Sequence, residues 1–289
     1  MTQGGKILVT GGTGNTGAAL ASRFRAANVP VRTASRKAVA DAHGGSKQVY
    51  FDWEDEATYG SALEGVERVY LVAPPLTDPE RVMVPFLRRA LKTGVRRAVL
   101  LSSSAIPEGG PVLGQVHRAV REMMPEWAVL QPSWFMQNFT GGMHGGAIRA
   151  SGEIVTATGE GRVAFVDVGD IAEVAFRTLT DAEPHNKAHV ITGPQALSYA
   201  EAAAIISEAA HRPVHHVSIS GAQLRERLMG TGIPEGYAAL LAGLDEAIKN
   251  GAEDRVTSTV QEVTGRPPNS LGEFARDHAP VWRGPGTEA

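Results

Sequence analysis

The start of the chain carries the feature that most limits its fold: a short apolar run, a cluster of glycines, and an alanine-rich segment with helical spacing. These occupy residues 6–10, 11–17 and 18–27. Such an order of strand, tight turn and helix is the context that a dinucleotide-binding loop requires. One glycine permits the turn, another lets the backbone approach a pyrophosphate, and the last lets the helix pack on the strand. We therefore expect a nucleotide whose phosphates lie at the positive end of this helix.

The glycines fit two known spacings, so spacing alone does not choose a subfamily. Gly12, Gly14 and Gly17 satisfy the general dinucleotide pattern, and Gly11, Gly14 and Gly17 satisfy the variant of extended and atypical short-chain dehydrogenases. Both registers place the same loop between the same strand and helix. The kind of nucleotide has to be read from elsewhere in the sequence.

The residues after the second expected strand indicate the nucleotide. Residues 29–34 have a strand pattern, and Ser35, Arg36 and Lys37 follow them. A site for NAD places an acid about 20 residues beyond the glycines to hold the ribose 2′-hydroxyl, yet residues 1–40 contain no acid. A guanidinium instead suits a 2′-phosphate. The alternative is that Arg36 and Lys37 are solvated turn residues, since such side chains are common on surfaces. We expect NADP(H).

The gross composition excludes several classes of function. The chain has 289 residues, 43% of them hydrophobic, and a net charge of -3, which argues against a nucleic-acid or anionic-membrane surface. It has no cysteine, which excludes disulfides, thiolate catalysis and cysteine-ligated metals. There is no signal-peptide pattern and no apolar run close to the roughly 20 residues that span a bilayer. We expect a soluble, cytoplasmic protein without a membrane or nucleic-acid partner.

Strand and helix patterns alternate through the first half of the chain. Further strands are expected at 48–51, 68–72, 97–101 and 127–131, with helices at 80–93 and 111–124. Alternation of this kind predicts an α/β fold, a Rossmann-type doubly wound parallel sheet. We expect an NADP-binding core over residues 1–152 and a smaller, mostly helical substrate-binding lobe over 153–289. Segments at about 164–192 are expected to return to the core.

The second half gives weaker signals. Strands are expected at 188–191 and 214–219. Ser198 and Glu201 have the spacing of a capping box at the start of a helix, and Asp170 with Glu173 has similar spacing. These carboxylates therefore have a structural rather than a catalytic interpretation.

The acid–base pair of a conventional short-chain dehydrogenase is absent. In such an enzyme a tyrosine exchanges a proton with the substrate, and a lysine four residues later lowers its pKa. None of the five tyrosines has a lysine at that spacing. His117 and Arg121 share one face of the corresponding helix. His117 is a candidate proton donor, with a pocket-lining or network role as the alternative.

Three hydroxyls, Ser102, Ser103 and Ser104, follow the fifth expected strand. One of them is a candidate for contact with the nicotinamide or the substrate; the alternative is that they satisfy backbone groups of their own loop. The nine histidines are scattered along the chain, and no metal site is expected.

Several segments, taken in order, resemble the NmrA-like atypical short-chain dehydrogenases and reductases. They are the glycine loop and residues 35–36, 51–53, 70–75, 101–105, 130–139, 165–168, 170–172 and 192–194. Within that group the chain is most similar to bacterial relatives of the ergot-alkaloid biosynthesis reductases, through residues 114–117, 243–245 and 264–268. The resemblance covers nearly the whole chain and is more specific in its first half.

The resemblance implies an NADPH-dependent reductase of a C=N (iminium) or conjugated C=C bond in a small organic molecule. An iminium already carries the charge that hydride neutralises, so its reduction does not need a strong proton donor, and the missing pair is explained. The chain departs from the group at Gln131, where an arginine is usual, at Gln137, where a glutamate is common, and at Arg121, where many members have an acid. These departures concern the substrate more than the cofactor.

The resemblance also implies the residues of the site. The cofactor set is Gly11, Thr13, Gly14, Asn15, Thr16, Gly17, Ser35, Arg36, Lys37, Asp52, Trp53, Val72, Ala73, Pro74 and Ser102. Within it, Asp52 is expected to face the adenine, and residues 72–74 to lie beside the ribose and nicotinamide. The substrate set is Ser103, Ser104, His117, Trp134, Phe135, Met136 and Asn138, with His117 and Ser104 as the catalytic candidates. Trp134 and Phe135 have an equally good interpretation as core residues.

Two other functions fit the same residues. One is a non-catalytic sensor that binds NAD(P) and reports its redox state to a protein partner, which the missing acid–base pair favours. The other is a quinone or azo-dye reductase, which differs only in the electron acceptor. A small-molecule substrate and a monomer or homodimer are expected for the enzyme.

Overall fold

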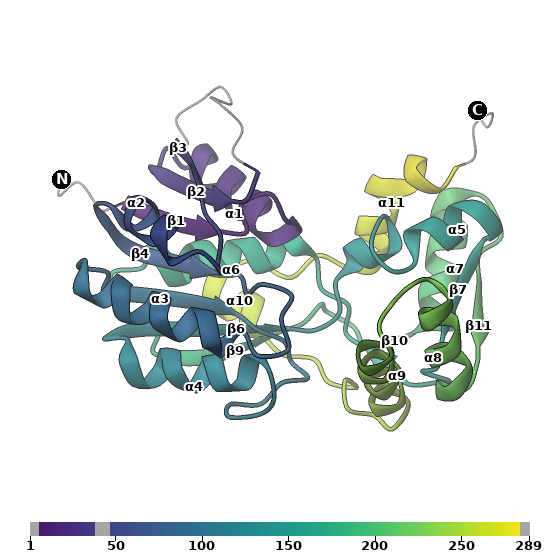
Figure 1. Ribbon diagram of the computed structural model, residues 1–289. Helices are drawn as coiled ribbons and strands as arrows, with labels where there is room; N and C mark the ends of the chain where they lie inside the picture. The colour runs from purple at the N-terminus through teal and green to yellow at the C-terminus, as the bar shows by residue number, and fades with distance from the viewer. Residues whose placement is uncertain (1–5, 38–46, 284–289) are drawn as a thin grey trace. The chain divides into compact units, whose positions relative to one another are not determined.

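The computed structural model describes residues 6–37 and 47–283, and the chain divides into two compact units (Figure 1). Unit 1 consists of Met1–Pro132, Val168–Ile191 and Glu262–Gly265, and unit 2 of the remaining segments. The chain first leaves unit 1 at Pro132, where the strand β6 ends, and not at residue 152 as the sequence suggested. The segment that returns to unit 1 supplies one helix and one strand.

Unit 1 is built on a parallel sheet of seven strands in the order β3-β2-β1-β4-β5-β6-β9. The strands are β1 Lys6–Thr10, β2 Val31–Ser35, β3 Lys47–Tyr50, β4 Val66–Leu71, β5 Arg97–Leu101, β6 Glu126–Pro132 and β9 Lys187–Ile191. Ile7, Leu8 and Val9 are all buried, as expected for a central strand covered on both faces. The strand order reverses between β1 and β4, and ligands of such sheets bind outside the carboxyl ends of the strands at this point.

Helices cover both faces of the sheet, so the expected Rossmann-type fold is confirmed (Figure 1). They are α1 Asn15–Ala26, α2 Tyr59–Leu63, α3 Glu80–Lys92, α4 Leu113–Met123 and α6 Val168–Thr180, with the short 3₁₀ turn Glu56–Thr58 before α2. Helices α1 and α6 pack against each other, as do α3 and α4. The core beside α3 contains an aromatic group whose rings meet mostly edge to face: Phe51, Trp53, Tyr59 and Phe86.

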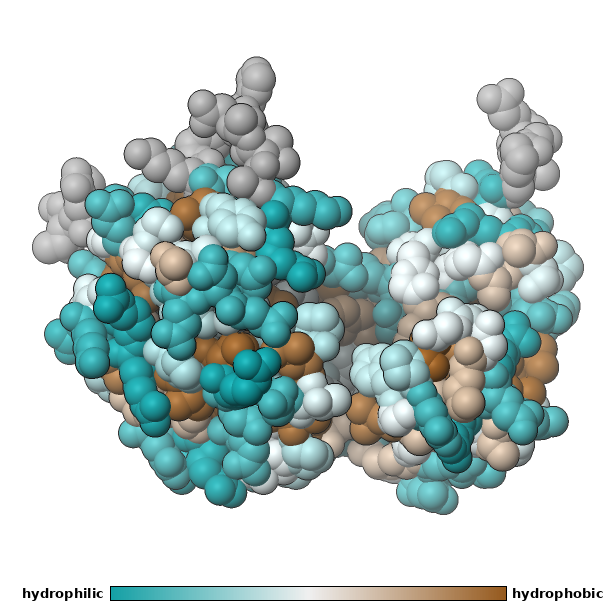
Figure 2. Space-filling model, viewed as in Figure 1, coloured by the Kyte–Doolittle hydropathy of each residue, from teal (hydrophilic) through white to brown (hydrophobic). Residues whose placement is uncertain are grey.

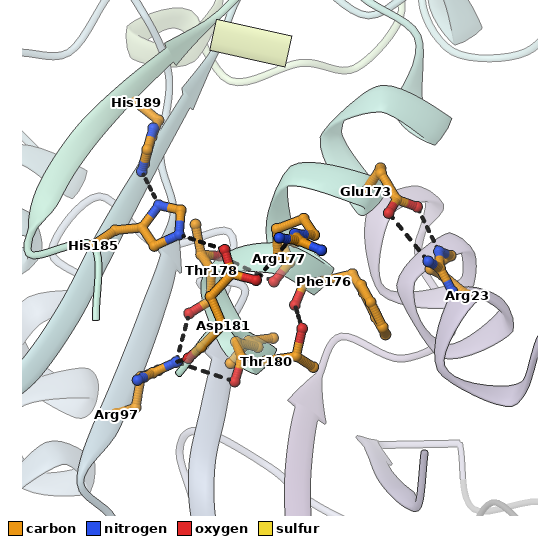
Figure 3. Close-up of polar contacts among 12 residues, drawn as sticks. Arg23, Arg97, Glu173, Phe176, Arg177, Thr178, Thr180, Asp181, His185 and His189 are labelled. Atoms are coloured by element: carbon orange, nitrogen blue, oxygen red, sulfur yellow. Dashed lines mark hydrogen bonds and ion pairs between the residues drawn. The ribbon is translucent and has the colours of Figure 1, made fainter. Parts of the chain in front are cut away.

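The end of helix α6 is fixed at the amino ends of the strands by buried charge (Figure 3). The Arg97 guanidinium donates to the backbone oxygen of Asp181 at 2.7 Å and pairs with Glu126 at 2.8 Å. His185 hydrogen-bonds the Asp181 carboxylate at 3.1 Å and the ring of His189 at 2.9 Å. A cationic donor suits the carbonyl end of a helix because the helix dipole is negative there.

The middle of α6 is tied to α1 by an ion pair. Glu173 accepts from the Arg23 guanidinium at 2.5 Å and 3.2 Å, and the same guanidinium lies over the ring of Phe176 (Figure 3). Since α6 begins at Val168 and Glu173 faces Arg23, Glu173 does not act as the capping residue that its spacing suggested. The returning segment is thus held in unit 1 at the middle and at the carboxyl end of its helix.

Unit 2 is mostly helical, as expected, with two small sheets. Its helices are α5 Gly145–Ser151, α7 Tyr199–Ala210, α8 Gly221–Gly230, α9 Glu235–Lys249 and α11 Leu271–Trp282, and the turn Met136–Phe139 is a 3₁₀ helix. The strand pairs are β7 Glu153–Thr156 with β11 His215–Ser218, and β8 Arg162–Val163 with β10 Leu197–Ser198. The short helix α10 Thr259–Thr264 precedes the last return to unit 2. The predicted capping box of Ser198 and Glu201 is confirmed at the start of α7.

Hydrophilic residues cover most of the visible face of each unit, with apolar residues between them (Figure 2). Within the described part of the chain, no helix has both the length and the apolar character needed to cross a bilayer.

Candidate dinucleotide site

The glycine loop joins β1 to α1 and leaves the start of that helix open. Gly11 has a φ of +64°, which favours glycine, and a Cβ there would lie 2.9 Å from the Cβ of Val72. A Cβ on Gly17 would overlap the backbone oxygen of Gly11, so the helix can approach the turn only with glycine. Gly14 caps α1, no side chain caps it, and its first turn contains no acid. Its first N–H groups are therefore suited to an anion such as a pyrophosphate.

The two described residues directly after β2, Arg36 and Lys37, are both basic. Arg36 and Lys37 are exposed, and among the described residues neither forms an ion pair. The hydroxyl of Ser35 donates to the backbone oxygen of Lys37 at 2.9 Å, so Ser35 shapes its own turn. This arrangement suits a 2′-phosphate better than a free 2′-hydroxyl, which an acid normally accepts from.

The ends of β3 and β4 form the next part of the edge. The Trp53 indole N–H donates to the backbone oxygen of Val72 at 3.1 Å, and its ring belongs to the aromatic core. Trp53 thus holds the loop after β4 from the aromatic core, whereas the sequence analysis placed it among the cofactor contacts. Thr10 fixes the same loop, because its hydroxyl accepts the Val72 N–H at 2.8 Å. Asp52 caps a turn by accepting the N–H of Glu54 at 3.0 Å.

The other members of the cofactor set, apart from Ser102, lie on the glycine loop or on the loop after β4. Thr13, Asn15 and Thr16 belong to the turn and the first residues of α1, and Ala73 and Pro74 follow β4 and are half-buried. Sequence reasoning missed the part played by Thr10. The available signal was a hydroxyl at the last position of the first strand, next to the glycines.

The three serines after β5 have different environments. Ser102 is buried, and its hydroxyl has no hydrogen-bond partner among the described residues. The Ser103 hydroxyl accepts the Ala105 N–H at 3.3 Å. Ser103 therefore satisfies a backbone group of its own loop, which was the alternative to a ligand contact. Ser104 is half-buried and its N–H donates to the backbone oxygen of Pro132 at 3.0 Å. Buried hydroxyls normally have partners, so Ser102 is the serine whose position points to a ligand.

His117 lies on α4 with its ring 6.3 Å from that of Trp127, near the start of β6. It is 3% exposed, and its Nδ1 has no hydrogen-bond partner in the part of the chain that the structure describes. Burial lowers its pKa, with a smaller contribution from Arg121, while Glu108 opposes the change. Arg121 itself pairs with Glu108 at 2.8 Å. A histidine held neutral in this way is poorly suited to donate a proton at pH 7.

The predicted substrate residues beyond β6 belong to unit 2. Met136 is fully buried in its core, so it is a packing residue and not a pocket residue. Trp134 is half-buried and packs on the same core, and Phe135 pairs with Val166 in an isolated bridge. Asn138 is half-buried, and its backbone oxygen accepts the N–H of His144 at 3.0 Å.

A Rossmann-type sheet with an open glycine loop defines a nucleotide-binding protein of the dehydrogenase and reductase type. Residues 3–274 match the model of the NmrA-like family. The chain belongs to that family.

Relatives match along nearly the whole chain. The uncharacterized oxidoreductase YesF of Bacillus subtilis is 51% identical over 279 residues, 96% of each chain. Agroclavine dehydrogenase of Claviceps fusiformis is 37% identical over 96% of this chain and 98% of its own. The NAD(P)H azoreductase of Xenophilus azovorans is 36% identical over 96% and 99%. The chain is accordingly an oxidoreductase, and the expectation of an enzyme is confirmed.

Proposed function

We propose that the chain is an NADPH-dependent reductase that transfers hydride to an iminium C=N bond or a conjugated C=C bond of a small organic molecule. The observation that carries the proposal is the carboxyl edge of the sheet. There, an uncapped helix follows the glycine loop, and Arg36 and Lys37 have no carboxylate partner among the described residues. Similarity to agroclavine dehydrogenase and to an NAD(P)H azoreductase supports hydride chemistry on an organic acceptor.

The residues of unit 1 divide the binding of NADPH among them. The N–H groups at the start of α1 bind the pyrophosphate, and Arg36 with Lys37 binds the 2′-phosphate. The loop of residues 72–74, held by Thr10 and Trp53, lies beside the ribose and the nicotinamide. The Ser102 hydroxyl, which is buried and has no partner among the residues that the structure describes, donates to the ligand. When bound, NADPH supplies the hydride.

The absence of a tyrosine–lysine pair directs the choice of bond. Hydride addition to an iminium carbon produces a neutral amine, and no proton has to reach the reacting atoms in that step. A conjugated C=C bond also needs a proton at the neighbouring carbon. Ser104 and His117 remain our proposed residues for that proton, although burial makes His117 the weaker candidate. We therefore favour the iminium.

Trp134, Phe135 and Asn138 remain our proposed substrate contacts. All three are half-buried, and each therefore keeps some surface on unit 2 for an apolar or polar part of the substrate. Met136 is left out because it is fully buried.

A second acceptor class, the azo bond, is favoured by the relative named NAD(P)H azoreductase. The test uses the purified protein with NADPH labelled by deuterium at its transferable position. A cyclic iminium, an enone, a quinone and an azo dye are offered in parallel. We expect the fastest loss of NADPH with the iminium and deuterium on the former iminium carbon. Turnover of only the azo dye would make the azo bond the acceptor in place of the iminium. No turnover with any acceptor would contradict the proposal.

A further inference from the structure

Gln48 on β3 holds the turn that presents the two basic side chains. Its side-chain NH₂ donates to the backbone oxygen of Lys37 at 2.9 Å and to the Ser35 hydroxyl oxygen at 3.2 Å. The Ser35 hydroxyl in turn donates to the same Lys37 oxygen at 2.9 Å. The amide thus joins the end of β2 to the residue two positions later through a closed set of three hydrogen bonds.

The parallel register between the two strands explains how Gln48 reaches the turn. Gln48 lies opposite Thr33, and the strand pairing ends with Tyr50 opposite Ser35. Its side chain therefore extends along the sheet toward the carboxyl end of β2, where the backbone leaves the sheet. Placing an amide there adds two donors without adding charge. An acidic side chain at the same place would repel a phosphate.

Two of the three hydrogen bonds are accepted by a backbone oxygen, and none involves the Arg36 or Lys37 side chain. Arg36 and Lys37 remain exposed, while the Lys37 backbone oxygen accepts hydrogen bonds from Gln48 and Ser35. Fixing the backbone of a residue costs conformational entropy. Because the folded protein has already ordered this turn, a phosphate that binds to it does not have to order it.

We propose that Gln48 is a positioning residue that sets the preference for a 2′-phosphorylated nucleotide, by ordering the turn of Ser35, Arg36 and Lys37. The inference rests on the proposed use of NADPH and adds a residue that touches neither the hydride nor, on this geometry, the phosphate. It predicts that loss of the amide weakens only the part of the binding that depends on the 2′-phosphate.

The test is calorimetric titration of the full chain with adenosine 2′,5′-bisphosphate and, separately, with AMP. The variants are Gln48→Met, which keeps the length of the side chain but removes the donors, Ser35→Ala and Arg36→Ala. Gln115→Met is the matched control, because Gln115 donates to the backbone oxygen of Gly109 at 2.6 Å in another loop of unit 1. Melting temperatures establish that each variant is folded.

We expect Gln48→Met to weaken binding of the bisphosphate about fivefold, as the loss of ordinary hydrogen bonds allows, with AMP changed by less than about twofold. Ser35→Ala changes binding in the same direction and less, and Gln115→Met leaves both ligands unchanged. Equal weakening of both ligands in Gln48→Met would overturn the positioning role. A Gln48→Met protein that keeps the preference which Arg36→Ala loses would also overturn it, and would leave the proposed use of NADPH intact. A wild-type chain without preference for the bisphosphate would contradict both.

Discussion

The two edges of the parallel sheet use polar side chains in opposite ways. At the amino edge, the buried Arg97 guanidinium contacts Glu126 and the backbone oxygens of Thr178, Asp181 and Ala182. At the carboxyl edge, the hydroxyl of Ser102 is buried and has no partner within residues 6–37 and 47–283. Arg36 and Lys37 also form no ion pair among the described residues there.

The difference separates residues that hold the fold from residues kept for a ligand. A buried polar group without a partner costs about 1–3 kcal/mol, so a protein retains one only where something else satisfies it. A charged side chain whose hydrogen bonds and ion pairs are all made within the protein has no donor or acceptor left for a ligand. Substitutions at the amino edge should therefore change stability, and those at the carboxyl edge should change binding.

The largest effect is expected at Arg97. Arg97→Met removes the buried partner of Glu126 and the donors to the end of α6, which should lower the free energy of unfolding by about 3–5 kcal/mol. Urea denaturation followed by circular dichroism measures the change. The matched control is Arg96→Met, because Arg96 is 73% exposed and 3.9 Å from the same carboxylate. Equal losses of unfolding free energy in Arg97→Met and Arg96→Met would show that the buried guanidinium at the amino edge does not hold the fold.

The next effect is a dependence on pH through His189. Burial, and then the neighbouring His185 and Lys187, lowers the pKa of His189 to about 3. Between about pH 6.5 and pH 3 the unfolded chain therefore binds a proton that the folded chain does not. The contribution of His189 to the free energy of unfolding is fully present above about pH 6.5. It falls as the pH decreases, by up to about 1.4 kcal/mol per pH unit.

Urea denaturation at several pH values between about 7 and 4 tests this dependence, with His189→Gln as the variant. The slope of stability against pH should be shallower in the variant than in the wild type. His215→Gln, which changes an exposed histidine, should keep the wild-type slope. A His189→Gln protein with the wild-type slope would show that another group controls the acid sensitivity.

At the carboxyl edge the largest effect is expected from Arg36→Ala. Loss of a charge-assisted, paired contact to the 2′-phosphate should weaken NADPH binding about tenfold to hundredfold. NADH binding and the melting temperature should not change, because the side chain is exposed and forms no ion pair with the described residues. Fluorescence titration with both nucleotides measures this. A change in the melting temperature without a change in nucleotide preference would show that Arg36 serves the fold and not the ligand.

The smallest effect separates two adjacent serines. Ser102→Ala removes a buried hydroxyl without a partner and should leave the free energy of unfolding unchanged or raise it by about 1 kcal/mol, while lowering NADPH affinity. Ser103→Ala removes the acceptor of the Ala105 N–H and should lower stability by about 1 kcal/mol. Chemical denaturation with and without NADPH compares them. Greater destabilisation by Ser102→Ala would mean that its hydroxyl serves the fold.

The sequence by itself determined the α/β class, most strand positions of unit 1 and the glycine loop. These depend on local constraints: a central strand must be apolar on both faces, and a turn with positive φ next to a tightly packed helix must use glycine. Gly11 and Gly17 occupy such positions. The absence of an acid among residues 1–40 is equally local, and it was visible without the structure.

Only the tertiary structure decided which polar side chains have partners. It placed Trp53 beneath the β4 loop and Met136 in the core of unit 2, gave Ser103 a backbone partner and left Ser102 without one. It also brought the amide of Gln48 to the carbonyl of Lys37. Partnerships of this kind depend on the register between strands and on packing between distant segments. Residue identity along the chain does not specify those distances, and they are fixed only when the sheet assembles.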